Sequence, residues 1–126
     1  MGATMPIKSI KNLLEDYIKQ GEFDYAFISD DSGLPMVCAG SNMPVSETQA
    51  ALLSRIKNTI AMVDQHKGLG SIEEMVFSMS GKRKLIVHNF TIHNKQLLLA
   101  ASMESHRPYK RVTTSFIRQL QTVWNL

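Results

Sequence analysis

Residues 23–48 read FDYAFISDDSGLPMVCAGSNMPVSET, and this stretch decides the fold of the chain. Residues 25–29 alternate in character as a β-strand does. The DDSG tetrad at 30–33 contains residue types that accept a left-handed backbone or hydrogen-bond their own main chain, which predicts a tight turn. The run that continues to Ala39 is then the second strand of a hairpin. Because Pro35 has no N–H to donate, that second strand is predicted to lie at a sheet edge.

A long amphipathic helix is predicted directly after the hairpin, over residues 46–65. Its main apolar stripe is wide enough to cover a sheet and comprises Leu52, Leu53, Ile56, Ile60 and Val63. Small or apolar side chains continue around the helix beyond that stripe, at Ala50, Ala51, Thr59, Ala61 and Met62. A helix with a single core-facing side does not require this many. Two interpretations stay open: the second side contacts another surface, or all of these residues fill the core.

One helix precedes the hairpin and ends at Gly21, a residue typical of helix stops. After the long helix, strands are predicted over residues 72–80, 84–92 and 97–103, and a last helix is predicted from Ser105. The third of these strands is apolar on both faces, so it is predicted to be central. The order αββαβββα predicts an α+β fold, a five-stranded antiparallel sheet flanked by helices in a profilin-like or longin-like sandwich. A single domain is predicted over residues 1–126.

The composition is that of an ordinary globular protein, with 44% hydrophobic and 20% charged residues, which argues against disorder. The longest apolar run, residues 97–101, is far too short to span a membrane, so no stable membrane insertion is predicted. No charged and apolar leader opens the chain, which argues against secretion. The lone Cys38 excludes an internal disulfide and suits a reducing compartment. We therefore predict a cytoplasmic protein.

The net charge of +3 and the pI near 9.1 make the chain mildly basic. Between residues 105 and 126 there is no acidic residue but there are four basic ones, namely Arg107, Lys110, Arg111 and Arg118. A nucleic-acid surface interleaves accessible aromatic residues with basic ones. Here the aromatic residues fall on the helix stripe that is predicted to be buried. No nucleic-acid partner is predicted. A solvated surface, an acidic protein partner and a lipid surface remain as interpretations of the basic charge.

No catalytic or metal-binding constellation is found in the sequence. The histidines at positions 66, 88, 93 and 106 contain no zinc-ligand pair backed by a second pair. Cys38 has no neighbouring His or Lys that would activate its thiol. We predict no metal, no cofactor and no enzymatic activity. Arg83 and Arg107 are the two candidates for an inserted arginine finger, because each lies where an element begins.

The order and spacing of these elements resemble a roadblock/dynein light-chain domain, of the kind found in small bacterial and archaeal regulators of Ras-like GTPases. The features that carry the resemblance are the hairpin, the Ala-rich helix from Ser46, the segment LGSIEEMV at 69–76 and the strand LLLAA at 97–101. The resemblance covers residues 7–124. It implies a non-enzymatic adaptor or regulator that binds a Ras-like small GTPase.

The resemblance also implies a homodimer in which strand 72–80 of each subunit pairs across the two-fold axis and the long helices pack side by side. The implied dimer interface comprises Ala51, Arg55, Thr59, Met62, Glu73, Met75, Phe77 and Met79. This arrangement is physically reasonable, because no strong charge interrupts Met75 to Ser80 and the strand would otherwise be an uncovered apolar edge.

The GTPase is expected on the paired long helices, with Arg55, Lys57, Asn58 and Asp64 as a polar rim around small apolar positions. The competing site is the basic last helix. The alternative function is a ligand-sensing module of the PAS or profilin type, which would need a pocket between sheet and helix lined by buried polar groups. His88 and Asn89 are the candidates for such groups.

Overall fold

The computed structural model describes residues 5–30, 35–40, 46–66, 68 and 70–124, and all structural statements below concern these residues. The elements follow the predicted order αββαβββα. They are α1 (Ile7–Lys19), β1 (Tyr25–Ser29), β2 (Pro35–Gly40), α2 (Ser46–Asp64), β3 (Glu74–Met79), β4 (Arg83–Ile92), β5 (Lys95–Glu104) and α3 (Tyr109–Trp124). The predicted α+β sandwich is therefore confirmed. The turn predicted at residues 30–33 lies largely outside the described residues.

The five strands form one antiparallel sheet with the order β2-β1-β5-β4-β3. β5 is the central strand, as its two apolar faces predict. β2 lies at one edge, so the prediction made from Pro35 is confirmed. β3 lies at the other edge and pairs only with β4 among the described strands.

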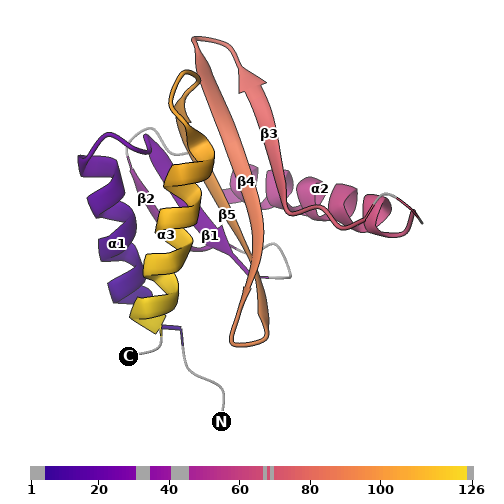
Figure 1. Cartoon of the computed structure of the whole chain (residues 1–126), viewed down its shortest axis with the longest axis horizontal. Helices are drawn as coiled ribbons and strands as arrows, with labels where there is room; N and C mark the ends of the chain where they lie inside the picture. Colours follow the sequence, from indigo (N-terminus) through magenta and orange to yellow (C-terminus); the bar gives the residue numbers. More distant parts are fainter. Residues whose placement is uncertain (1–4, 31–34, 41–45, 67, 69, 125–126) are drawn as a thin grey trace.

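Helices cover both faces of the sheet, as predicted (Figure 1). α1 and α3 lie side by side on one face, and the Tyr17 hydroxyl is 2.8 Å from Ser115 Oγ across their contact. Beneath them the rings of Tyr17, Phe23 and Phe116 pack with centroids 5.2–6.0 Å apart. α2 lies on the opposite face, where Ile56 and Ile60 join a second, separate cluster. The central strands are therefore covered on both sides.

Two positions show why the chain turns where it does. Gly40 has φ +113°, and a Cβ there would lie 2.5 Å from the carbonyl oxygen of Asp24, so only glycine permits this approach of β2 to β1. His93 and Asn94 both have positive φ, 53° and 63°, between the paired residues Ile92 and Lys95. This is the two-residue hairpin whose twist matches that of the flanking strands.

The last helix begins at Tyr109, so the start predicted at Ser105 is wrong. Lys84, which is only 8% exposed, donates hydrogen bonds from Nζ to the carbonyl oxygens of Ser105 and Arg107. Its ammonium group also lies 5.0 Å from the ring centroid of Tyr109. These contacts hold the backbone after β5 in a turn, and the helix starts only after Pro108.

Candidate partner-binding surface

The outer edge of β3 is uncovered among the described residues. Met75 and Phe77 are partly buried and pack against the cluster under α2. Val76 and Met79 are exposed, at 43% and 53%. A strand with an open row of backbone N–H and C=O groups and exposed apolar side chains is a ready template for pairing with another strand.

One side of α2 is turned away from the sheet and contains little charge. Ala51, Arg55, Thr59 and Met62 are all exposed, and Met62 is 65% exposed. The hydroxyl of Thr59 donates to the carbonyl oxygen of Arg55 at 3.0 Å, which satisfies its donor within the helix. Ala61 is exposed as well. The interpretation that all of these small or apolar residues fill the core is therefore wrong for the four whose side chains the structure describes, while the side chain of Ala50 lies outside the described part of the chain. The outward side, with Ala51, Thr59 and Met62, remains for another surface.

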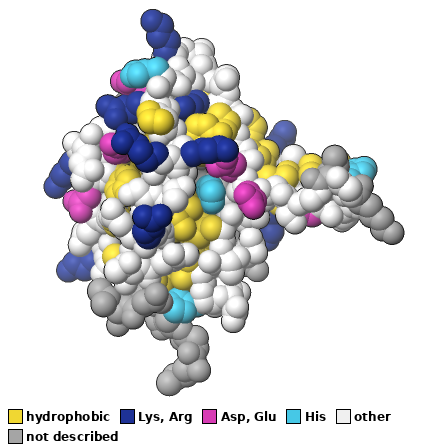
Figure 2. Space-filling model, in the orientation of Figure 1, with side chains coloured by type: hydrophobic (Ala, Val, Ile, Leu, Met, Phe, Trp, Pro, Cys, Tyr) yellow, Lys and Arg dark blue, Asp and Glu magenta, His cyan; other side chains and the backbone are white. Residues whose placement is uncertain are grey.

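α2 also extends beyond the sheet. Figure 1 shows the helix crossing behind the strands and running out past the β3 edge, and Figure 2 shows the same projection as a lobe. The chain returns from this overhang to β3, and hydrogen bonds connect the end of the returning segment to α2 and to β4. Asp64 Oδ1 accepts a hydrogen bond from the N–H of Ile72 at 3.2 Å, and the N–H of Asn89 donates to the carbonyl oxygen of Glu73 at 2.7 Å. The overhang and the edge strand thus form one connected surface.

The predicted polar rim does not form a single patch. Successive helical residues are about 100° apart, so Arg55 and Lys57 point about 200° apart. Arg55 and Asn58 are exposed near the outward side. Lys57 and Asp64 instead line a hollow of about 240 Å³ between α2 and the ends of β4 and β5.

The ligand-sensing alternative requires a pocket between the sheet and a helix, and this hollow lies in that position. Asn89 and Gln96 line it, and they are bonded to each other through Gln96 Nε2 and Asn89 Oδ1 at 2.5 Å. Asn89 Nδ2 also donates to the carbonyl oxygen of Ile72 at 3.4 Å. His88, the other candidate, lies elsewhere: its Nδ1 is 3.4 Å from Glu74 Oε2. The side-chain amides of Asn89 and Gln96 therefore bond each other and the loop backbone at Ile72, and they do not converge on an enclosed cavity.

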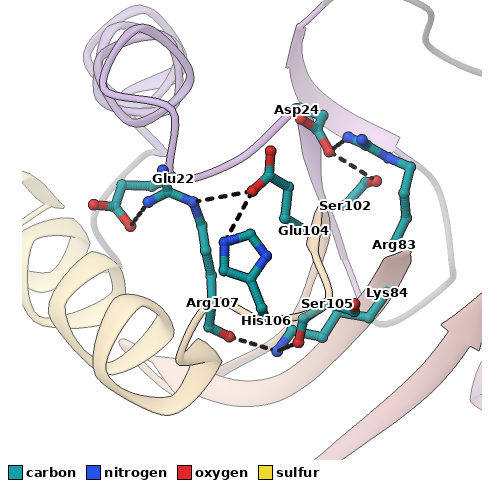
Figure 3. A network of polar contacts seen from close by, with 9 residues as sticks. All are labelled: Glu22, Asp24, Arg83, Lys84, Ser102, Glu104, Ser105, His106 and Arg107. Atoms are coloured by element: carbon teal, nitrogen blue, oxygen red, sulfur yellow. Dashed lines mark hydrogen bonds and ion pairs between the residues drawn. The ribbon is translucent and has the colours of Figure 1, made fainter. Parts of the chain in front are cut away.

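The two candidate arginine fingers are engaged within the chain (Figure 3). Arg83 forms an ion pair with Asp24. In Arg107, Nη1 lies 3.7 Å from Glu22 Oε2 and Nε lies 3.9 Å from Glu104 Oε2. Both guanidinium groups help to join the strand ends to the segments before and after them. Residues already held by carboxylates of the same chain are poor candidates for insertion into a partner's active site.

The described residues contain no group of three His, Cys, Asp or Glu side chains that would hold a metal ion. Cys38 is exposed on β2. None of the described helices is long and apolar enough to cross a bilayer.

Sequence reasoning missed Val76 as a surface residue. The signal was present, because alternation along a strand places Val76 on the face opposite to Met75 and Phe77. The structure leaves that position exposed at the open edge, since α3 does not cover it.

The residues of the implied dimer interface fall on two elements and the segment before β3. Met75, Phe77 and Met79 lie on β3, and one side of α2 presents Ala51, Arg55, Thr59 and Met62. Glu73 is exposed just before β3.

Solved structures with the same fold were found by comparison. The gliding protein MglB from Thermus thermophilus has a TM-score of 0.67 at 16% identity, over 94% of this chain and 87% of that one. Myxococcus xanthus MglB has a TM-score of 0.69 at 12% identity, over 96% and 99%. A roadblock/LC7 domain from Streptomyces avermitilis has a TM-score of 0.66 at 11% identity, over 90% and 92%.

No protein-family model and no curated protein matches the sequence. At these identities the structural likeness establishes the fold alone. The chain has the fold of the roadblock/LC7 and MglB proteins, and the resemblance inferred from element order and spacing is confirmed at that level.

Proposed function

We propose that this chain is a cytoplasmic, non-enzymatic adaptor that forms a homodimer and binds a Ras-like small GTPase on the outward side of its paired α2 helices. The observation that carries the proposal is that the open β3 edge and the uncovered overhang of α2 adjoin each other, in a fold shared with MglB.

Dimerisation would complete both features at once. Pairing of β3 with β3 of a second copy gives the open backbone groups hydrogen-bond partners. The same two-fold operation places the overhangs of the two α2 helices side by side, where Met62 can be buried in the contact between them. An isologous contact of this type is the commonest basis of a homodimer.

The GTPase would then contact the paired helices. The small side chains of Ala51 and Thr59 allow close approach of a partner backbone, and Arg55 and Asn58 supply a polar margin. We do not include Lys57 and Asp64 in this contact, because they line the hollow on the other side of α2. The role of the adaptor would be to hold or position the GTPase's own catalytic residues, and this chain would supply none.

The sensor alternative has little support. The hollow under α2, about 240 Å³, is smaller than the roughly 300–1,000 Å³ of small-molecule sites. Its amide side chains are occupied by each other and by the loop backbone.

The test is affinity capture from an extract of the source cells, loaded with either GDP or a non-hydrolysable GTP analogue, followed by mass spectrometry. The bait is the wild type, beside Arg55→Glu/Asn58→Ala on α2 and the charge-matched Lys8→Glu on α1. We expect a small GTPase that is retained by the wild type and by Lys8→Glu, and is lost with the α2 variant. Each bait is first shown to have the same subunit number.

Retention of the GTPase by the α2 variant would show that it binds elsewhere. Absence of any small GTPase under both nucleotide conditions would contradict the proposal. Hydrolysis of GTP by the purified chain alone, abolished by a single substitution, would contradict its non-enzymatic part.

A further inference from the structure

The outward side of α3 is basic and is not involved in the proposed GTPase contact. α3 lies on the face of the sheet opposite to α2 (Figure 1). Lys110, Arg111, Thr114, Ser115 and Arg118 line a shallow depression of about 350 Å³ on this side. Figure 2 shows Lys and Arg side chains gathered over this face of the molecule.

The basic residues of this segment differ in how they are engaged. Arg107 is paired with Glu22 and Glu104, and Lys110 Nζ lies 3.7 Å from Glu74 Oε1. Arg111 and Arg118 are exposed, and neither has an ion pair or a hydrogen bond from its side chain among the described residues. Two guanidinium groups are thus presented to the outside without a carboxylate of their own chain.

The seven-residue spacing of Arg111 and Arg118 determines how their guanidinium groups are placed on α3. Seven residues correspond to about 10 Å along a helix and nearly two full turns, so Arg111 and Arg118 project from the same side of α3. The exposed hydroxyl of Thr114 lies between them in sequence and lines the same depression. A guanidinium group binds a carboxylate through two parallel hydrogen bonds. The surface therefore matches two carboxylates about 10 Å apart.

The apolar residues of α3 argue for a protein partner over a membrane. Val112, Phe116, Leu120 and Trp124 are all buried beneath the helix, so this side presents none of them to insert into a bilayer. Helices that lie in a membrane interface combine basic residues with an accessible apolar face. This helix supplies only the charge.

We infer that the outward side of α3 binds an acidic segment of a second protein, in which Arg111 and Arg118 each pair with a carboxylate, with glutamate or aspartate seven residues apart on a partner helix. The inference does not depend on the proposed GTPase contact. Because α3 and α2 lie on opposite faces of the sheet, the adaptor has room for two different partners at the same time.

The test uses fluorescence anisotropy with a labelled Ala-based helical peptide that carries two glutamates seven residues apart. Its control is the same peptide with glutamines. The protein variants are Arg111→Gln/Arg118→Gln and, as a charge-matched control, Lys8→Gln/Lys95→Gln, in which both lysines are exposed. We expect the wild type and the lysine control to bind the glutamate peptide equally, the arginine variant to bind about tenfold more weakly, and raised salt to weaken binding.

Amide chemical shifts of the wild type should move along residues 110–119 during the titration. Equal losses in the two double variants would show only a general charge attraction and would overturn the inference. Equal binding of the glutamine peptide would overturn it as well. Binding of vesicles that contain phosphatidylglycerol, lost in the arginine variant, together with no binding of the peptide, would assign the surface to a membrane instead.

Discussion

The two faces of the sheet differ in how completely the chain covers them. On one face, α1 and α3 enclose a cluster of aromatic rings in which Phe23 and Phe116 are almost fully buried. On the other face, Ile56 and Ile60 anchor α2, while Met62 stays exposed and the helix runs beyond the sheet. The first face is closed by packing within the chain. The second has the form of a surface that another molecule completes.

This difference separates the residues that hold the fold from those available for binding. Substitutions on the α1/α3 face should lower the free energy of unfolding, whereas substitutions at the β3 edge and on the outward side of α2 should change association. The two faces would not differ in this way if both sets of substitutions changed the free energy of unfolding and the association constant to the same extent.

The largest effect is expected for Phe116→Ala. Its ring packs against Tyr17 and Phe23, so removing it leaves a cavity and should reduce the free energy of unfolding by about 3–5 kcal/mol. Met62→Ala, on the open side, should change it by no more than about 0.5 kcal/mol. Urea unfolding at submicromolar protein concentration measures both. Similar losses in the two variants would mean that the two faces do not differ as described.

A smaller loss is expected for Lys84→Met, about 1–3 kcal/mol. The substitution leaves the carbonyl oxygens of Ser105 and Arg107 without their donor in a partly buried site. The matched control is Lys95→Met, since Lys95 is exposed at the start of the next strand. Equal stability of the two variants in thermal unfolding would exclude a role for Lys84 in setting the start of α3.

Val76→Lys should weaken self-association at least about tenfold, which corresponds to about 1.4 kcal/mol, and should leave the fold of the protomer intact. A lysine on an edge strand discourages pairing with a second strand. Val76 is a better choice than Met75 or Phe77, because those side chains also pack beneath α2. Sedimentation velocity over a dilution series gives the association constant, and circular dichroism checks the fold. An unchanged association constant would exclude the β3 edge from the contact.

The smallest effect is expected for Asp64→Ala, about 0.5–1 kcal/mol, because its hydrogen bond to the Ile72 N–H is exposed. The loss should be local, and hydrogen exchange at the Ile72 amide should become faster. Asp16→Ala, an exposed carboxylate on α1, serves as the control and should leave that amide unchanged. No change in exchange at Ile72 would show that Asp64 does not anchor the overhang.

Local patterns were sufficient to predict the elements, one edge of the sheet and its central strand, whereas the edge position of β3 followed from the resemblance. Pro35 predicted one edge, and the apolar residues on both faces of β5 predicted its central place. The start of α3 was not predictable in this way, because it depends on Lys84, which is more than 20 residues away in sequence and bonds the turn from the side. Such a tertiary contact leaves no periodic signal.

The candidate surface was predicted in part. Apolar residues beyond the main stripe of α2 left two interpretations open, and the exposure of Met62 decides between them in favour of a second, outward side. The separation of Lys57 from Arg55 was available from helical geometry alone, since two residues turn the helix by about 200°. That Lys57 and Asp64 border a hollow required knowledge of how α2 crosses β4 and β5.

The most direct test of the central claim, that the open edge and overhang are completed by a second copy of this chain, is the mass in solution by light scattering at micromolar concentration. We expect the wild type to have twice the 14.2 kDa mass of one chain, and Val76→Lys to shift toward 14.2 kDa. A wild-type mass of 14.2 kDa across the whole concentration range would contradict it.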